Sequence, residues 1–176
     1  MSERLINAVK KGAIVRSAEL IAEGDSATYQ DFECETPLHY AVMGGHLAVA
    51  ELLLQSGALI NAQNNYGQTP LLKAIYAEDL DMIVALLSWD ADPNIESIHP
   101  PDSPLREAAR RGLFEAINYL ILAGADIDKQ HELSAAPVVQ AALEGKDQAV
   151  YALIEAGASL EPLRIAAAEA DKRRLR

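Results

Sequence analysis

The sequence predicts an all-α protein in which about five helix–turn–helix repeats stack into a solenoid, followed by a shortened final repeat. The first observation is the stretch TPLHYA at residue 36, which returns as TPLLKA at 69, SPLREA at 103, APVVQA at 136 and EPLRIA at 161. The second is a parallel series with ELLLQSGA from 51, ALLSWDA from 85, YLILAGAD from 119 and ALIEAGAS from 152. The first three intervals of the TPLHYA series are 33, 34 and 33 residues, and the second series recurs in the same register.

Each copy of the first series contains the start of a helix. Thr36, Thr69 and Ser103 can cap a helix by accepting a hydrogen bond from a free backbone amide, and the following proline suits the first turn. Leucine or valine comes next, and alanine three residues later falls on the same helical face and allows close packing. These positions predict helices over 37–45, 70–78, 104–112 and 137–145, with an N-terminal equivalent over 3–11 and a single final helix over 162–174.

Each copy of the second series closes a second helix. A short break at Gly45, Glu78, Gly112 or Gly145 separates the two apolar runs, and the glycine after the second run matches a left-handed C-cap. Asp90 replaces that glycine once, at a modest cost in backbone strain. The second helices are predicted over 14–23, 47–56, 80–89, 114–123 and 147–156, and a polar extended loop such as NAQNNYGQ follows.

Two motif series in one period resemble the ankyrin-repeat family, whose signature T-P-L-H-x-A recurs at about 33 residues. The resemblance covers nearly the whole chain. It implies one ankyrin-repeat domain over residues 1–176, divided into an N-terminal capping repeat (1–35), repeats over 36–68, 69–102, 103–135 and 136–160, and a truncated C-terminal cap helix (161–176).

Composition excludes several classes of partner. The formal charge of -11 and a pI near 4.7 argue against nucleic acid and against an anionic membrane, because both are bound mainly through Lys and Arg. A single cysteine allows no intrachain disulfide, and no apolar segment reaches the roughly 18 residues of a membrane helix. We therefore expect a monomeric cytoplasmic protein, without a cofactor.

A histidine and a cysteine raise the question of catalysis. Cys34 lies close to His39 in sequence, and an imidazole can hold a thiol as thiolate. All of the other copies have a different residue at the position of His39, however. In the ankyrin-repeat family that the chain resembles, this histidine is a structural hydrogen-bonding residue. His46 lies about 10 Å further along a helix, too far to share a metal with His39. We predict no catalytic residue and no metal site, with Cys34 either strained or in a differently bent loop because it aligns with Gly67.

The resemblance implies a protein partner that contacts the loop tips and the exposed side of the first helices. The helix position is read seven residues after each cap, and the loop positions just before it. The residues that we predict to bind the partner are Phe32, Glu33, Glu35, Met43, Asn65, Tyr66, Gln68, Tyr76, His99, Arg110, Arg111 and Leu143. Tyr66 and Tyr76 are expected to be the strongest single anchors, since aromatic residues dominate interface hot spots.

The function class stays open between two main alternatives. One is an adaptor or inhibitor that occupies the partner's surface, an antidote to a toxic enzyme included, and the other is a structural or self-assembling subunit. Residues 69–102 hold seven carboxylates against Lys73, a net charge of 1 - 7 = -6. This excess either aids solubility or steers a basic partner surface toward the binding face.

Overall fold

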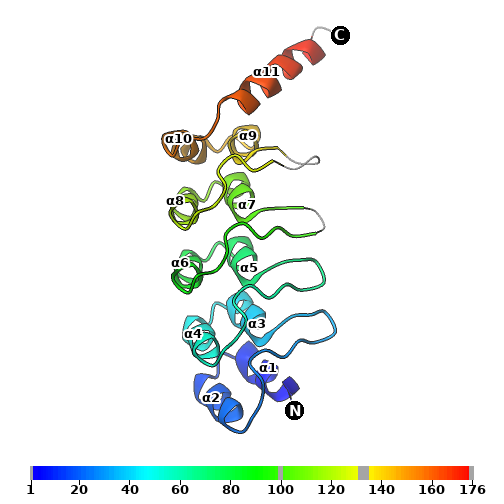
Figure 1. Ribbon diagram of the computed structural model, residues 1–176, viewed down its shortest axis with the longest axis vertical. Coiled ribbons are helices and arrows are strands. Elements are labelled where there is room, and N and C mark those ends of the chain that lie inside the picture. Colours follow the sequence, from blue (N-terminus) through cyan, green and yellow to red (C-terminus); the bar gives the residue numbers. More distant parts are fainter. Residues whose placement is uncertain (1, 99–100, 131–134, 175–176) are drawn as a thin grey trace.

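The computed structural model describes residues 2–98, 101–130 and 135–174, and within these ranges it contains eleven α-helices and no strand. The helices form two columns (Figure 1). One column contains α1 (Ser2–Lys10), α3 (Pro37–Met43), α5 (Pro70–Tyr76), α7 (Pro104–Arg111) and α9 (Pro137–Leu143). The other contains α2 (Ile14–Ala22), α4 (Leu47–Gln55), α6 (Leu80–Ser88), α8 (Phe114–Leu122) and α10 (Asp147–Glu155), and α11 (Glu161–Arg174) follows. The predicted fold is confirmed, and no helix end differs from its expected position by more than two residues.

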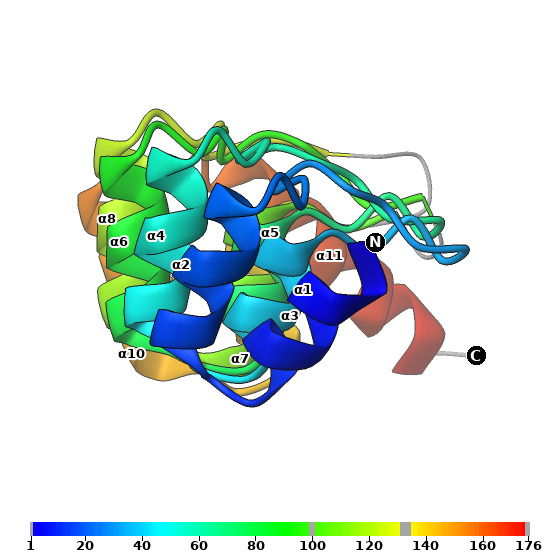
Figure 2. The same cartoon turned by 90° about the horizontal axis from the view of Figure 1, so that it is seen from below.

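The loops that join one helix pair to the next extend away from the helices on the side of the first column (Figure 2). We call residues 25–35, 58–68, 91–102 and 125–135 the first to fourth hairpin loops, of which the third and fourth include residues outside the described ranges. The loop between α10 and α11 spans only residues 156–160, so the last position in the stack has no hairpin loop. Helix α11 packs against α9.

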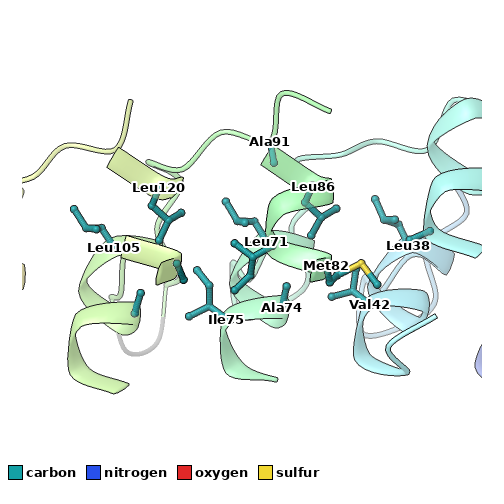
Figure 3. Close-up of a cluster of buried hydrophobic side chains, with 14 of the residues drawn as sticks. Leu38, Val42, Leu71, Ala74, Ile75, Met82, Leu86, Ala91, Leu105 and Leu120 are labelled. Carbon is teal, nitrogen blue, oxygen red and sulfur yellow. The ribbon is translucent and has the colours of Figure 1, made fainter. Parts of the chain in front are cut away.

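The repeated apolar positions form one continuous core between the two columns. Leu38, Leu71 and Leu105 are at most 1% exposed, and Figure 3 shows them beside Met82 and Leu86 of the second column. The alanine three residues after each leucine is fully buried, which lets the columns approach closely. Truncating such a leucine to alanine costs about 2–5 kcal/mol, so the pattern that predicts the helices also supplies most of the stability.

Helix caps follow the predicted chemistry in three of the repeats. The side chains of Thr36, Thr69 and Ser103 each accept a hydrogen bond from the backbone N–H three residues later. Ala136 has no such side chain, and α9 begins with proline alone. A threonine or serine cap contributes about 1 kcal/mol over alanine, so α9 starts less firmly than its neighbours.

A residue one or two positions after each first helix and each second helix has a left-handed backbone, as the glycines at most of these positions suggest. Asp90 has a φ of 61°, which confirms the predicted strain at the one second-helix end that lacks glycine. Glu78, in the turn between α5 and α6, has a φ of 56°, where the equivalent turns contain glycine. Within the described residues, no helix is long and apolar enough to cross a bilayer.

Candidate protein-interaction surface

The first two hairpin loops are each organised by one short polar side chain. The Asp31 carboxylate accepts hydrogen bonds from the backbone N–H groups of Glu33 and Glu35, at 2.9 and 3.0 Å. Asn64 occupies the equivalent place and accepts from the N–H groups of Tyr66 and Gln68, both at 2.9 Å. A side-chain oxygen bonded to the backbone two residues on is the usual signature of an Asx turn. Sequence reasoning missed both residues, although an Asp or Asn five residues before a capping threonine was a readable signal.

Backbone hydrogen bonds hold successive hairpin loops in register. The Asn65 N–H donates to the Glu33 carbonyl at 3.0 Å, and its side-chain amide donates to the Phe32 carbonyl at 3.0 Å. In the next step along the stack, the Ile98 N–H donates to the Tyr66 carbonyl at 2.8 Å. The loop tips at residues 32–33, 65–66 and 98 therefore form a row of fixed spacing along the solenoid, which we call the ledge.

Large apolar side chains project from this ledge and from the first helices. Phe32 is 87% exposed and Tyr66 is 52% exposed, each at the tip of its loop. Met43 and Leu143, at the ends of α3 and α9, are also exposed. Ile98 is 52% exposed on the third loop, and sequence reasoning missed it because that loop is one residue longer than the others. His99 lies outside the described residues.

Two predicted contact residues are not exposed as expected. Glu35 is buried, where its carboxylate lies 2.9 Å from the Lys73 ammonium of α5 and accepts from the Asn64 side-chain amide at 2.9 Å. Tyr76 is half-buried and lies near the side chains of Ser97 and Gln68. Burial raises the pKa of the Tyr76 hydroxyl, and nearby Asp102 raises it further. The expectation of exposure is wrong for Glu35, whereas Tyr76, like Glu33, Gln68 and Arg111, is partly exposed.

The predicted arginine pair on α7 is engaged within the chain. Arg110 contacts the buried Glu107 carboxylate at 2.6 Å, and Arg111 binds the same carboxylate and lies 2.9 Å from Glu78. The Arg111 guanidinium also sits 5.5 Å from the centre of the Tyr76 ring. The two guanidinium groups hold the pKa of Glu107 below its usual value against the effect of burial. Arg110 and Arg111 therefore neutralise a buried charge of their own helix.

The acidic excess of residues 69–102 is distributed over several sides of the solenoid. Glu78 pairs with Arg111, Asp79 caps α6, and Glu96 lies 3.7 Å from the Lys129 ammonium. Asp102 lies 2.9 Å from Arg106, and burial raises the pKa of this carboxyl to about 6. The excess is thus partly compensated inside the molecule.

His39 belongs to the scaffold in the way that the sequence predicts. It is fully buried, and its Nδ1 accepts from the Thr36 N–H at 3.1 Å, which leaves Nε2 to donate to the Gln68 carbonyl of the following hairpin loop at 3.1 Å. Burial lowers the pKa of the imidazole, so the ring stays neutral at pH 7. Cys34 has a φ of 58°, so of the two alternatives the strained one is correct. Among the described residues, no group of three or more His, Cys, Asp or Glu side chains is placed to hold a metal ion.

Two columns of paired helices with stacked hairpin loops define a helical-repeat protein. Comparison with known families agrees: a profile of three ankyrin repeats matches residues 5–97, more than half of the chain. The chain belongs to the ankyrin-repeat family. Ankyrin repeats generally act as protein–protein interaction modules, and the fold is typically non-enzymatic.

Several curated proteins from animals and plants are similar to the chain. The ankyrin repeat and KH domain-containing protein mask-1 of Caenorhabditis elegans is 34% identical over 62% of this chain and 4% of its own length. The transient receptor potential cation channel subfamily A member 1 of Drosophila melanogaster is 30% identical over 76% of the chain and 11% of its length. The E3 ubiquitin-protein ligase XBAT33 of Arabidopsis thaliana is 27% identical over 89% of the chain and 31% of its length. The chain spans less than a third of the length of each of these relatives. Their names describe different activities, so they assign none to this chain.

Proposed function

We propose that the chain binds a protein partner through the tips of its hairpin loops and the exposed ends of its first helices, acting as an adaptor or inhibitor. The observation that carries this proposal is the placement of Phe32, Tyr66 and Ile98 on three successive loops. Their backbones are joined by hydrogen bonds across the repeats, so the side chains are held in a row before any partner arrives. Pre-organised aromatic and aliphatic side chains are the usual anchors of protein interfaces.

The charges around this row favour apolar contact as the source of affinity. Glu35 is paired with Lys73, and Arg110 with Glu107, so these groups offer little unsatisfied charge to a partner. The surface residues of the proposed contact are those that remain accessible at the ledge and on the first helices: Phe32, Glu33, Met43, Asn65, Tyr66, Ile98 and Leu143. Of the two tyrosines, Tyr66 is the proposed anchor, since Tyr76 is half-buried.

A capture experiment with paired variants tests this proposal. The immobilised chain would be incubated with native lysate, and retained proteins identified by mass spectrometry for the wild type and for the double variant Phe32→Ser, Tyr66→Ser. Leu59→Ser is the matched control, because Leu59 is 57% exposed in the same loop as Tyr66 but close to α4 rather than at the tip. A true partner is retained by the wild type and the control and lost from the double variant.

An identified partner then allows a quantitative test. Tyr66→Ala alone should weaken binding by about tenfold, corresponding to at least 1 kcal/mol, with an unchanged melting temperature. Equal retention of every protein by the wild type and the double variant would move the interface away from the loops. Whether the partner is an enzyme that loses activity on binding separates an inhibitor or antidote from an adaptor.

The self-assembling alternative and the basic-partner proposal have their own measurements. We expect the chain to remain a monomer over the whole micromolar range of concentration, because a net charge of -11 opposes self-association. Light scattering measures the mass of the particle in solution. A partner with a basic surface should associate several-fold more slowly at high salt with little change in dissociation, since the Debye length shrinks to about 8 Å at physiological ionic strength. An association rate indifferent to salt would leave the acidic excess as a solubility feature.

A further inference from the structure

The second column of helices carries exposed apolar side chains in its C-terminal half. Leu122 of α8 is 83% exposed and Tyr151 of α10 is 68% exposed. Trp89, Tyr119 and Ile154 are 40%, 44% and 37% exposed. We call these five residues the outer apolar patch. It lies on the column opposite the hairpin loops, so it is separate from the proposed loop surface (Figure 2).

The repeat register places these residues next to one another. Helices α6, α8 and α10 lie side by side, with α8 packed against both neighbours (Figure 1). Tyr151 of α10 occupies the position that Asn118 occupies in α8. Leu122 lies one helical turn after Asn118, on the same outer side of α8. Tyr119 precedes Leu122 by three residues on the same helix, and residues three or four apart are neighbours on a helix surface. Trp89 follows α6 at the position that Ala123 occupies after α8, and α6 packs against α8.

In α4 of the same column, the positions equivalent to Trp89, Leu122 and Tyr151 are polar. Ser56 and Gln55 stand where the later repeats have Trp89 and Leu122, and Glu51 stands where α10 has Tyr151. The repeat fold therefore does not require apolar residues here, and the earlier repeats stack without them. Exposed aromatic and leucine side chains clustered on one face mark a binding surface in soluble proteins, because each buried Å² returns about 25 cal/mol.

Acidic side chains surround the patch. Asp90 follows Trp89 directly, Glu115 lies one turn before Tyr119, and Glu155 is the α10 counterpart of Leu122. All three are exposed, and none forms an ion pair within the described part of the chain. A surface of this kind combines an apolar centre with uncompensated negative charge at its edge.

From this arrangement we infer that the outer apolar patch docks an amphipathic helix whose apolar face is flanked by lysine or arginine. The apolar side chains of such a helix would cover Leu122, Tyr119 and Tyr151, and its cations would meet Asp90, Glu115 and Glu155. A second copy of the chain fits poorly, since it brings the same acidic edge and a net charge of -11. The chain would then hold two partners on opposite sides, one at the hairpin loops and one at the second column.

The patch contains the single tryptophan of the chain, which provides a direct reporter. A synthetic helical peptide of leucine and lysine, with all leucines on one face, would be titrated into the protein while tryptophan emission is recorded. We expect a saturable shift to shorter wavelength as the indole of Trp89 leaves water. A peptide of the same composition in scrambled order should bind about tenfold more weakly, because it cannot present a continuous apolar face.

Leu122→Glu separates docking from simple charge attraction. The variant adds a negative charge, so non-specific attraction of a basic peptide would become stronger, whereas docking on the patch should weaken about tenfold. Val15→Glu on α2 is the matched control, since Val15 is 71% exposed on the second column outside the patch. It should leave the affinity within about twofold of the wild type, and circular dichroism melting checks that both variants fold.

Three results would overturn the inference. They are the absence of a saturable emission shift, a Leu122→Glu variant that binds as tightly as the wild type, and a shift that appears with rising protein concentration in the absence of peptide, which would make a second copy the occupant. The double variant Phe32→Ser, Tyr66→Ser should bind the peptide normally. Failure of the loop proposal and failure of this one are therefore distinguishable.

Discussion

Two units of the solenoid, each made of a hairpin loop and the first helix after it, bury different polar residues at one position. They are the α3 unit and the α7 unit. The third residue of α3 is His39, which is neutral and bonds to Thr36 and to the Gln68 carbonyl of the following hairpin loop. In α7 the same position holds Arg106, which is 4% exposed and lies 2.9 Å from Asp102 of its own loop. Helix α5, between them, has Leu72 there.

The difference shows that one backbone frame accepts a neutral imidazole, a guanidinium or an apolar side chain at the same buried position. At this position the α3 unit has a neutral imidazole with satisfied hydrogen bonds, although the same unit also buries Glu35 beside the Lys73 ammonium. We call it the neutral unit after this histidine. The α7 unit instead keeps charges inside, with Arg106 against Asp102 and Glu107 against two arginines, and such pairs become costly once one partner is removed. The two units should therefore respond differently to substitution and to pH.

The largest expected effect is on the charged unit. Arg106→Leu copies the residue of α5 but leaves the Asp102 carboxylate buried without its cation, so we expect a loss of about 3–5 kcal/mol in the free energy of unfolding by urea titration. The double variant Arg106→Leu, Asp102→Gln copies the α5 pair of Leu72 and Gln68, and should recover most of that loss. A double variant no more stable than Arg106→Leu would show that the charge pair is not what the site depends on.

His39→Ala tests the neutral unit and should have a smaller effect. It removes the bonds to Thr36 and Gln68 without leaving a buried charge, so the expected loss is about 1–3 kcal/mol. Thermal and urea unfolding measure it, with His46→Ala as a control, because His46 is only partly buried and makes one long contact to the Lys10 carbonyl at 3.3 Å. A loss for His39→Ala as large as that for Arg106→Leu would remove the distinction between the two units.

The two units should also give opposite slopes of stability with pH. Folding lowers the pKa of His39, so between that pKa and about 6.5 the unfolded chain binds more protons and stability rises with pH. Folding raises the pKa of Asp102 from 3.8 to about 6, so over that interval the folded chain binds more protons and stability falls as pH rises.

Comparing variants across this pH range isolates each contribution. Asp102→Asn removes the falling component, so the variant should gain about 1–2 kcal/mol relative to the wild type between pH 4 and pH 7. His39→Ala removes the rising component and should lose progressively more relative to the wild type over the same range. Urea titrations at pH 4, 5, 6 and 7 measure both differences, and a pH-independent difference for Asp102→Asn would place its ionisation outside this range.

The helices and the core could be predicted from the sequence because each depends on positions within one repeat. Capping residues, the leucine and alanine spacing, and the glycine ends recur with the period, and the structure confirms them. Exposure at the surface could not be predicted as well. Glu35 and Tyr76 have the register of contact residues, yet Glu35 pairs with Lys73 of α5, and Tyr76 lies near Ser97 of the following hairpin loop. A period does not reveal which long side chains meet between such segments. Trp89 and Leu122 belong to different repeats, and their exposure on one column emerges only when the second helices are stacked.

The smallest expected effect concerns the loop of the neutral unit, where Cys34 occupies the turn position that Gly67 fills one repeat later. Cys34 has a φ of 58° and Gly67 a φ of 73°, a region that costs a residue with a β-carbon about 1 kcal/mol. Cys34→Gly relieves this strain but gives the unfolded chain more freedom, so the net gain should be only about 0.5 kcal/mol.

Cys34→Ala separates the backbone from the thiol. Alanine keeps the β-carbon, and with it the strain, so it should match the wild type within about 0.3 kcal/mol if the thiol makes no contact of its own. A difference this small needs paired urea titrations under reducing conditions, where no intermolecular disulfide interferes. Cys34→Gly less stable than Cys34→Ala would mean that the cysteine side chain stabilises the loop by more than its strained backbone costs, and the loop of the neutral unit would then depend on a side chain that the next repeat omits.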